Sequence, residues 1–313
     1  MKTTTTAMTL IFSLLVLLAP GLIPGGATVE PTPVVTAAVA RVNDTGDVLP
    51  SERRSGAPSQ QAGLAQNAAE IQQLAETFAP LLRFDSKQGD KNKCFPSDAG
   101  QYYEKRRRGE KGRVCNTDYD SIERGDVPVY YQYAACGDDQ YVSYWFFYGW
   151  QDTCSPGEGE HPADWERVVV KIRPGNTRDR VMFFQHKGQY TKTRNHYKTY
   201  ENTHPVVYVG KNSHGSYHDD GGSGTCCYWE DFRNPGKPNQ KMQTWKNLVR
   251  LSKEPGSPEW MRYDGTKYWD GLTGPLFRKR DSDLCNLQGC RGSHLKVCHT
   301  GGCYKSDIGD KDM

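Results

Sequence analysis

The stretch QYVSYWFFYGW, residues 140–150, is apolar at both odd and even positions. Side chains alternate between the two faces of a β-strand, so such a strand must be covered by protein on both sides. Short β-branched and aromatic runs separated by turn residues accompany it: VPVYYQYA (127–134), WERVVVKI (165–172), RVMFFQH (180–186) and HPVVYVG (204–210). The pattern predicts a mostly β (α+β) fold, a β-sandwich with flanking helices.

Two segments have the spacing of helices. In LAQNAAEIQQLAETFAPLLRF, residues 64–84, apolar side chains recur on one helical face until Pro80 ends the pattern: Leu64, Ala68, Ile71, Ala75 and Phe78. The second segment is QKMQTWKNLVRL, residues 240–251. We expect both helices to lie against the sandwich.

Composition divides the chain into four parts. Lys2 precedes an apolar run that ends in Pro and Gly, which predicts a signal peptide over residues 1–27 and a secreted, extracellular protein. Residues 28–63 lack aromatics and cysteine, which predicts a linker or propeptide. The sandwich domain is expected over 64–279 and a Cys-rich extension over 280–313. No segment after the signal peptide is apolar enough to cross a bilayer.

All 10 cysteines lie between Cys94 and Cys303. In an exported protein this even number predicts a disulfide-rich fold with about five bridges, whose connectivity the sequence leaves open. We expect the last four cysteines to pin the C-terminal extension, and a zinc site there is the less favoured alternative. The net charge of +3 gives no argument for a nucleic-acid partner.

The segment GEHPADWERVVVKI, residues 159–172, places acidic groups at the start of a buried strand. Asp164 and Glu166 are two residues apart and therefore share a face of the strand. His161 precedes them, and Asp152 lies across a Pro/Gly turn. Three carboxylates and one imidazole form a cation site, in which calcium or magnesium is favoured over manganese or zinc.

Other interpretations of these and neighbouring residues stay open. An acidic pair at the start of a strand is more often a turn cap or an ion-pair partner than a metal site, and two carboxylates can also catalyse glycoside hydrolysis, which the spacing does not favour over metal. His218, Asp219 and Asp220 fit a polar loop with a turn-forming Asp-Gly pair. The basic run EKRRRGEKGR, residues 104–113, fits a solvated loop, a processing site or a contact to anionic headgroups.

Four motifs in order resemble the necrosis- and ethylene-inducing-like proteins (NLPs), and most closely the vacuolar-sorting-protein-type relatives of that superfamily. The motifs are FAPLLRFDS with CFPSD, YWFFYGWQD, H-x-x-DWE and HPVVYVGKNSHGSY. The likeness runs from about residue 70 to about residue 230. Pro162 and Ala163 stand where the GHRHDWE signature of the NLPs has Arg and His.

The resemblance implies a secreted β-sandwich that holds a divalent cation in an acidic cavity and binds sphingolipid glycan headgroups. Its cation ligands fall on Asp152, His161, Asp164 and Glu166. We further expect ligand contacts from Trp150, as an exposed aromatic at the rim, and from three other residues: His186, His214 and Tyr217.

The function predicted first is divalent-cation-dependent binding of a glycan or sphingolipid headgroup at a membrane surface, by a monomeric protein, with cytolysis as its toxin-like form. The second is a non-lytic secreted carbohydrate-binding module. The third is a hydrolase that uses Asp164, Glu166 and His161, and an enzyme is less favoured than a binding protein.

Overall fold

The computed structural model describes residues 57–153, 159–185, 188–222, 231, 233–236, 240–278, 283–287 and 290–291. Side chains of residues 57–66 and 290–291 are not among those described. The predicted signal peptide and most of the predicted linker lie outside these ranges. Within them, no helix has both the length and the apolarity to span a membrane.

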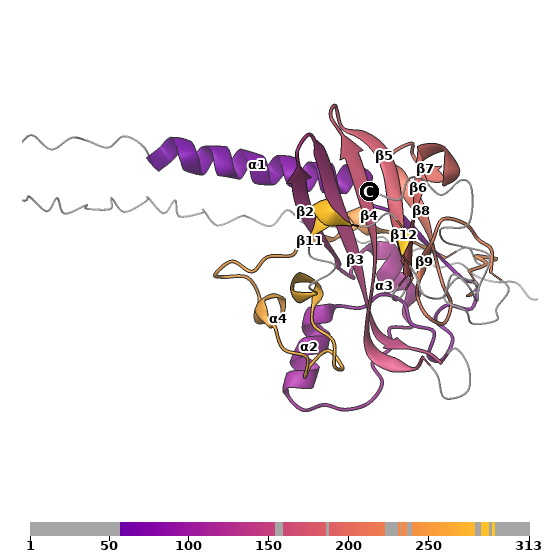
Figure 1. The fold of residues 1–313 in the computed structure, drawn as a ribbon. Coiled ribbons are helices and arrows are strands. Elements are labelled where there is room, and N and C mark those ends of the chain that lie inside the picture. The colour runs from indigo at the N-terminus through magenta and orange to yellow at the C-terminus, as the bar shows by residue number, and fades with distance from the viewer. Residues whose placement is uncertain are drawn as a thin grey trace, which may run out of the picture. The chain divides into compact units, whose positions relative to one another are not determined.

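The strands form two sheets, which confirms the predicted mostly β class (Figure 1). The seven-stranded sheet has the order β11 (Leu248–Arg250), β2 (Val129–Cys136), β3 (Asp139–Gln151), β4 (His161–Arg173), β5 (Thr177–Gln185), β6 (Gly188–Thr193) and β12 (Cys290–Arg291). The five-stranded sheet has the order β10 (Lys241–Gln243), β1 (Leu81–Phe84), β8 (His204–Val209) and β7 (Thr199–Tyr200), with β9 (Ser216–Tyr217) also paired to β8.

Alternate residues of β3 and β4 pack on opposite sides of the larger sheet. Phe146 and Val168 belong to the core that also holds Phe84 of β1 and Val207 of β8, so this core lies between the two sheets. Trp145 and Trp165 belong to a second apolar cluster. The two-sided burial predicted from residues 140–150 is confirmed, because β3 is buried from Tyr141 to Gln151.

The outer face of the large sheet is covered by helices and an aromatic loop. Helices α2 (Ala99–Arg107) and α4 (Glu259–Arg262) contact each other and lie close together in Figure 1. Trp260 and Trp269 pack there against Trp165, with ring centroids 6.3 Å and 5.8 Å away. This layer explains why both parities of β3 are apolar.

The predicted first helix is present as α1 (Ala57–Phe78) and begins earlier than Leu64. Ile71, Ala75 and Phe78 are buried in the core between the sheets, as expected. Ala68 is exposed, and Leu74 takes a place in the core instead. Among the helix residues whose side chains are described, 67–78, the buried face therefore begins at Ile71.

The second predicted helix, over residues 240–251, is wrong. This segment forms β10, a 3₁₀ turn (Thr244–Lys246) and β11. Met242 pairs with Leu82 of β1, and Leu248 pairs with Val129 of β2. These ladders satisfy the backbone groups that a helix would have satisfied internally.

The basic run at residues 104–113 is only partly a loop, which corrects the sequence interpretation. Its first residues complete α2, whose N-cap is Asp98 and whose last turn carries Lys105, Arg106 and Arg107. A further short helix, α3 (Tyr119–Arg124), also lacked a clear sequence signal. Its N-cap is the Asp118 side chain.

Two disulfides fall in the described residues, Cys94–Cys115 and Cys136–Cys285. The first closes a segment of 21 residues that contains α2. The second joins the end of β2 to a 3₁₀ turn (Leu284–Asn286) across 149 residues. Cys154, Cys226 and Cys227 lie outside the described residues.

Candidate functional site

Asp164 and Glu166 are buried between the two sheets. They lie on the same side of β4 as Val168 and Val170, which line the core between the sheets, whereas Trp165 faces the outer aromatic cluster. The exposed fractions of Asp164 and Glu166 are 4% and 3%. Two carboxylates this deeply buried need hydrogen bonds, a counter-charge or a metal ion.

His214 is the partner that the structure gives to Asp164. Its Nδ1–H donates to Asp164 Oδ2 over 2.9 Å, and its ring is fully buried. The same ring stacks on Tyr148, with a centroid distance of 3.9 Å and an interplanar angle of 2°. Tyr148 lies opposite Asp164 in the β3–β4 register, so the three side chains form one layer.

The electrostatics of this layer show that both acids lie near Tyr148. Burial raises the pKa of the Tyr148 hydroxyl well above its usual range, and the charges of Asp164 and Glu166 raise it further. Burial also raises the pKa of Tyr217, to which Asp231 and Glu166 contribute. Both phenols therefore stay neutral at physiological pH and keep their O–H groups as donors.

Several buried polar atoms in this interior have no hydrogen-bond partner among the described residues. They are His214 Nε2, Tyr148 Oη, Tyr217 Oη, Gln185 Oε1, Gln151 Oε1 and Ser216 Oγ. Leaving such atoms unsatisfied costs about 1–3 kcal/mol each. A polar occupant at this position, such as water or a cation with its water ligands, would remove that cost.

Asp231 forms hydrogen bonds to the loop that carries His214 and so fixes the position of His214. The Asp231 carboxylate accepts from the backbone N–H groups of Asn212 and Ser213 over 2.9 Å and 2.8 Å, and from Ser213 Oγ over 2.9 Å. His214 itself has φ +55°, a conformation that costs energy for a residue with a side chain. Gly210 is required beside it, because a Cβ there would approach Asp231 Oδ2 to 2.6 Å.

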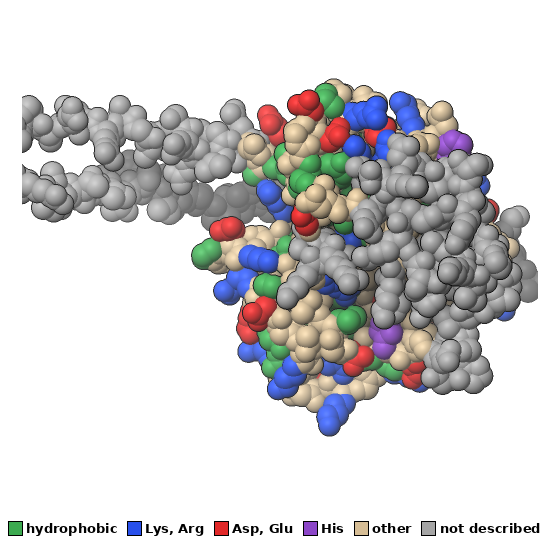
Figure 2. All heavy atoms as spheres, in the orientation of Figure 1, with side chains coloured by type: hydrophobic (Ala, Val, Ile, Leu, Met, Phe, Trp, Pro, Cys, Tyr) green, Lys and Arg blue, Asp and Glu red, His purple; other side chains and the backbone are tan. Residues whose placement is uncertain are grey.

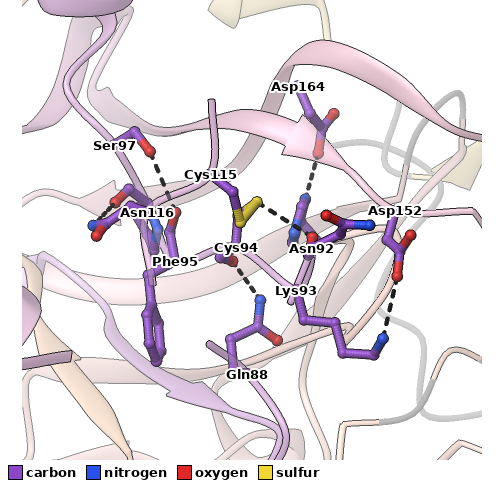
Figure 3. Close-up of a disulfide and its surroundings, with 12 residues drawn as sticks. Gln88, Asn92, Lys93, Cys94, Phe95, Ser97, Cys115, Asn116, Asp152 and Asp164 are labelled. Atoms are coloured by element: carbon purple, nitrogen blue, oxygen red, sulfur yellow. Dashed lines mark hydrogen bonds and ion pairs between the residues drawn. A yellow bond between two sulfur atoms is a disulfide. The ribbon is translucent and has the colours of Figure 1, made fainter. Parts of the chain in front are cut away.

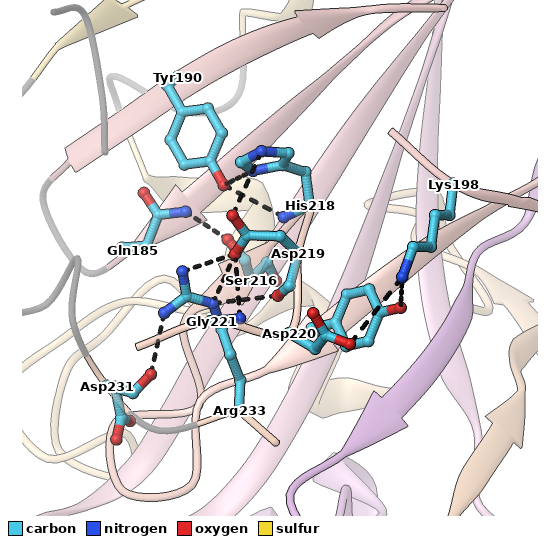
Figure 4. Close-up of polar contacts among 11 residues, drawn as sticks. Gln185, Tyr190, Lys198, Ser216, His218, Asp219, Asp220, Gly221, Asp231 and Arg233 are labelled. Carbon is cyan, nitrogen blue, oxygen red and sulfur yellow. Dashed lines mark hydrogen bonds and ion pairs between the residues drawn. The ribbon is translucent and has the colours of Figure 1, made fainter. Parts of the chain in front are cut away.

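A second polar network borders this loop (Figure 4). Arg233 Nη2 lies 2.7 Å from Asp219 Oδ1, and its guanidinium lies over the Tyr217 ring at 3.9 Å. His218 Nδ1 lies 2.8 Å from the hydroxyl of Tyr190. These contacts fix β9, and with it Tyr217, against the site.

Asp152 and His161 do not join the two buried acids in a single cluster. Asp152 Oδ2 lies 3.1 Å from Lys93 Nζ, so its charge is already paired (Figure 3). His161 is half-buried, with Nδ1 3.0 Å from the carbonyl oxygen of Pro162. Across the described part of the chain, no group of three or more His, Cys, Asp or Glu side chains is arranged to hold a metal ion.

The backbone between these residues is unusual. Ala163 has φ +59°, in the middle of the segment that connects His161 to Asp164. Opposite it, Gly149 packs so closely on the Val114 carbonyl that no Cβ would fit. Strained backbone of this kind persists only where the surroundings fix it, and it is concentrated at functional sites.

Trp150 differs from the exposed aromatic that the sequence led us to expect. It is 9% exposed, and the guanidinium of Arg113 covers its ring at 4.6 Å. His214 and Tyr217 do lie beside Asp164 and Glu166. His186 lies outside the described residues.

Sequence reasoning missed Lys93, Tyr148 and Asp231. Lys93 is 59 residues from its partner Asp152, a distance at which spacing carries no signal. Tyr148 was hidden inside an apolar run, although its register with Asp164 follows once β3 and β4 are paired. Asp231 follows a segment outside the described residues and lacks any recognisable motif.

Comparison with known proteins gives similarity in structure alone. No protein-family model matches the chain, and no curated protein matches it. Solved structures that align with it include necrosis and ethylene inducing protein 2 from the causal agent of cocoa's witches' broom disease, with 17% identity and a TM-score of 0.40. That alignment covers 66% of this chain and 85% of the other.

Two further structures align to a similar extent. NLPPya in complex with mannosamine has 14% identity and a TM-score of 0.41, over 66% of this chain and 84% of its own. The non-toxic HaNLP3 protein has 16% identity and a TM-score of 0.40, over 66% and 86%. At these scores the function has to be inferred from the residues of this chain.

Proposed function

We propose that this protein is a secreted, monomeric binder of glycan or sphingolipid headgroups at membrane surfaces, of the NLP type and nearest to its vacuolar-sorting-type relatives. The observation that carries the proposal is the buried pair Asp164 and Glu166 with His214 beside it. This arrangement falls on the H-x-x-DWE and HPVVYVGKNSHGSY motifs through which the sequence resembles that superfamily. In the toxin-like form of this activity, headgroup binding leads to lysis.

We further propose that headgroup binding depends on calcium or magnesium held by Asp152, His161, Asp164 and Glu166. The donor chemistry suits a hard cation, because three of the four groups are carboxylates. The register supports the grouping, since Gln151 pairs with His161 and Asp152 directly follows Gln151. When bound, the ion neutralises the carboxylates and offers coordination positions to sugar hydroxyls.

In this structure the ammonium group of Lys93 occupies the place beside Asp152 that the cation would take. It already neutralises Asp152, while His214 hydrogen-bonds Asp164. Cation binding would therefore require Asp152 to release Lys93. The unpartnered Nε2 of His214 and hydroxyl of Tyr148 support a polar occupant nearby.

The test combines thermal melts with dye release from phosphatidylcholine vesicles that contain a glycosylated sphingolipid. Calcium or magnesium should raise the melting temperature of the EDTA-treated protein, because ion at about a hundredfold its Kd stabilises the fold by about 2.7 kcal/mol. Asp164→Asn should abolish this shift, and Lys93→Met should increase the affinity for the ion. Asp126→Asn, on an exposed carboxylate, is the matched control.

The outcomes separate the three predicted functions. Chelator-sensitive dye release supports the lytic form, and vesicle binding without release supports the non-lytic module. Turnover of a glycan panel that is lost in Glu166→Gln would favour the hydrolase. A wild-type melting temperature that EDTA leaves unchanged, together with no metal in the native protein, would rule out the cation proposal.

A further inference from the structure

A basic, aromatic-lined cleft lies on the outer face of the large sheet, whereas Asp164 and Glu166 face the core between the two sheets. Its volume is about 340 Å³, and its walls come from α2, the loop after it, the ends of β3 and β4 and the loop after α4. Of the ligand contacts discussed above that belong to the described residues, only Trp150 lines it. Figure 2 shows Lys and Arg side chains over the part of the surface where α2 and α4 lie.

The charge of the cleft is strongly one-sided. Among the described residues, its lining holds one carboxylate, that of Asp270, and four cationic side chains, those of Arg106, Lys111, Arg113 and Lys267. The lining itself therefore has a surplus of three positive charges. Among the described residues, only Arg113 of these four has a carboxylate partner, Glu160 at 2.7 Å on the exposed surface. A concave site with such a surplus attracts and concentrates anions.

Arg106 is held in place without being neutralised. Its Nε donates to the Tyr102 hydroxyl over 2.9 Å, and its two Nη atoms donate to the carbonyls of Glu110 and Gly112 over 2.8 Å and 2.7 Å. All three acceptors are uncharged. The guanidinium therefore fixes the loop that carries Lys111 and keeps both its charge and its remaining N–H groups for a ligand.

Aromatic rings form the rest of the wall. Arg113 lies over Trp150 at 4.6 Å, and Lys267 lies over Tyr268 at 5.3 Å. Trp150 Nε1 is a buried donor that has no acceptor in the part of the chain that the structure describes. Cations held against aromatic faces, with a free N–H beside them, suit a ligand that joins an anion to a sugar or similar ring.

We propose that this cleft binds a phosphoryl group carried on a sugar-like headgroup. Phosphate esters accept several charge-assisted hydrogen bonds at once, and planar guanidinium groups are suited to that geometry. Lys111 and Lys267 line the same cleft from different segments of the chain. The cleft works without a divalent cation, so this inference and the cation proposal can fail separately.

The test is titration of the full chain with glucose 6-phosphate, inorganic phosphate and glucose, with EDTA present throughout so that the carboxylate site is empty. Isothermal titration should detect glucose 6-phosphate and no binding of glucose. Lys111→Gln/Lys267→Gln should weaken binding at least tenfold. The matched control Lys91→Gln/Lys105→Gln removes the same charge outside the cleft and should stay within about twofold of wild type.

A second arm identifies the source of the phosphoryl group. Co-sedimentation with phosphatidylcholine vesicles, with and without phosphatidylinositol, compares a lipid headgroup with the soluble ester. Binding to either that depends on Lys111 and Lys267 supports the site. Absence of binding to both, or equal losses in the cleft variant and the charge-matched control, would overturn it, because general electrostatic attraction would then account for the result.

Discussion

His204 illustrates how a single buried side chain couples this fold to pH. Its Nδ1–H donates to the Ala79 carbonyl over 2.7 Å, and its ring stacks on Trp245 at 3.7 Å. Burial lowers the pKa of the imidazole below its usual 6.5, and the hydrogen bond to Ala79 opposes this only in part. The folded state therefore holds His204 neutral where the unfolded chain already takes up a proton.

We predict that His204 makes the protein less stable in mild acid. Its contribution is complete above the unfolded pKa near 6.5 and falls as the pH drops below that value, by at most about 1.4 kcal/mol per pH unit. Urea unfolding at about pH 7.5 and about pH 5.5 should show a larger loss in wild type than in His204→Phe. Equal losses in the two proteins would exclude His204 as the cause.

At the scale of single residues, the sequence predicted several of the side chains that form the site but not which side chains pair with one another. Asp164, Glu166 and His214 were all singled out, and the structure brings the three together. The pairing of Asp152 with Lys93 was not predicted, because ion pairs over long separations depend on the fold. Trp150 was expected to be exposed, and Arg113 covers it, since Arg side chains pack well on aromatic faces.

The carboxylate of Asp231 fixes the conformation of the loop between β8 and β9 through its hydrogen bonds. Asp231 is 1% exposed and accepts from two backbone N–H groups and one hydroxyl of the loop. Without it, these donors would be buried and unpaired. The loop would then lose the conformation that holds His214 at φ +55° against Tyr148.

We predict that Asp231→Ala lowers the free energy of unfolding by about 3 kcal/mol, because several charge-assisted hydrogen bonds are lost together. Asp220→Ala, on an exposed carboxylate just after β9, should cost about 0.5 kcal/mol or less. Denaturant unfolding measures both. Hydrogen exchange should also quicken at the amides of Asn212 and Ser213 in Asp231→Ala alone, and unchanged exchange there would contradict the assigned role.

Secondary structure elements were predictable where the side chains alone determine them. The segments 144–148 of β3 and 168–170 of β4 are aromatic or β-branched at every position, which favours a buried strand. The segment 240–251 has Met242, Trp245 and Leu248 at helical spacing, yet it forms two short strands because β1 and β2 offer it free ladder positions. Strands of three or four residues depend on such partners, which the local sequence does not contain.

At the scale of the whole molecule, the two sheets and the outer aromatic layer depend on contacts between distant parts of the chain. The Cys136–Cys285 disulfide adds a covalent contact of this kind across 149 residues. Leu284 and Leu287 beside it pack with Val169 and Met182 on the outer face of β4 and β5. The bridge therefore anchors an apolar patch that covers the sheet.

We predict that the two described disulfides differ in their contribution to stability. In the loop-entropy account, a bridge across 149 residues is worth about 5 kcal/mol, and one across 21 residues about 3 kcal/mol. Cys136→Ser/Cys285→Ser should therefore lower the free energy of unfolding more than Cys94→Ser/Cys115→Ser, as measured by denaturant unfolding under non-reducing conditions.

The affinity for glucose 6-phosphate should distinguish the two disulfide variants. The Cys94–Cys115 bridge closes the segment that carries α2, Arg106 and Lys111, and it lies next to Lys93. Its removal should weaken glucose 6-phosphate binding even at temperatures where the protein stays folded, whereas removal of Cys136–Cys285 should leave that affinity unchanged. The contrary result would be that Cys94–Cys115 stabilises the fold more than Cys136–Cys285 and that its removal leaves glucose 6-phosphate binding unchanged. Local packing around Cys94, rather than loop closure, would then account for the stability that this bridge contributes.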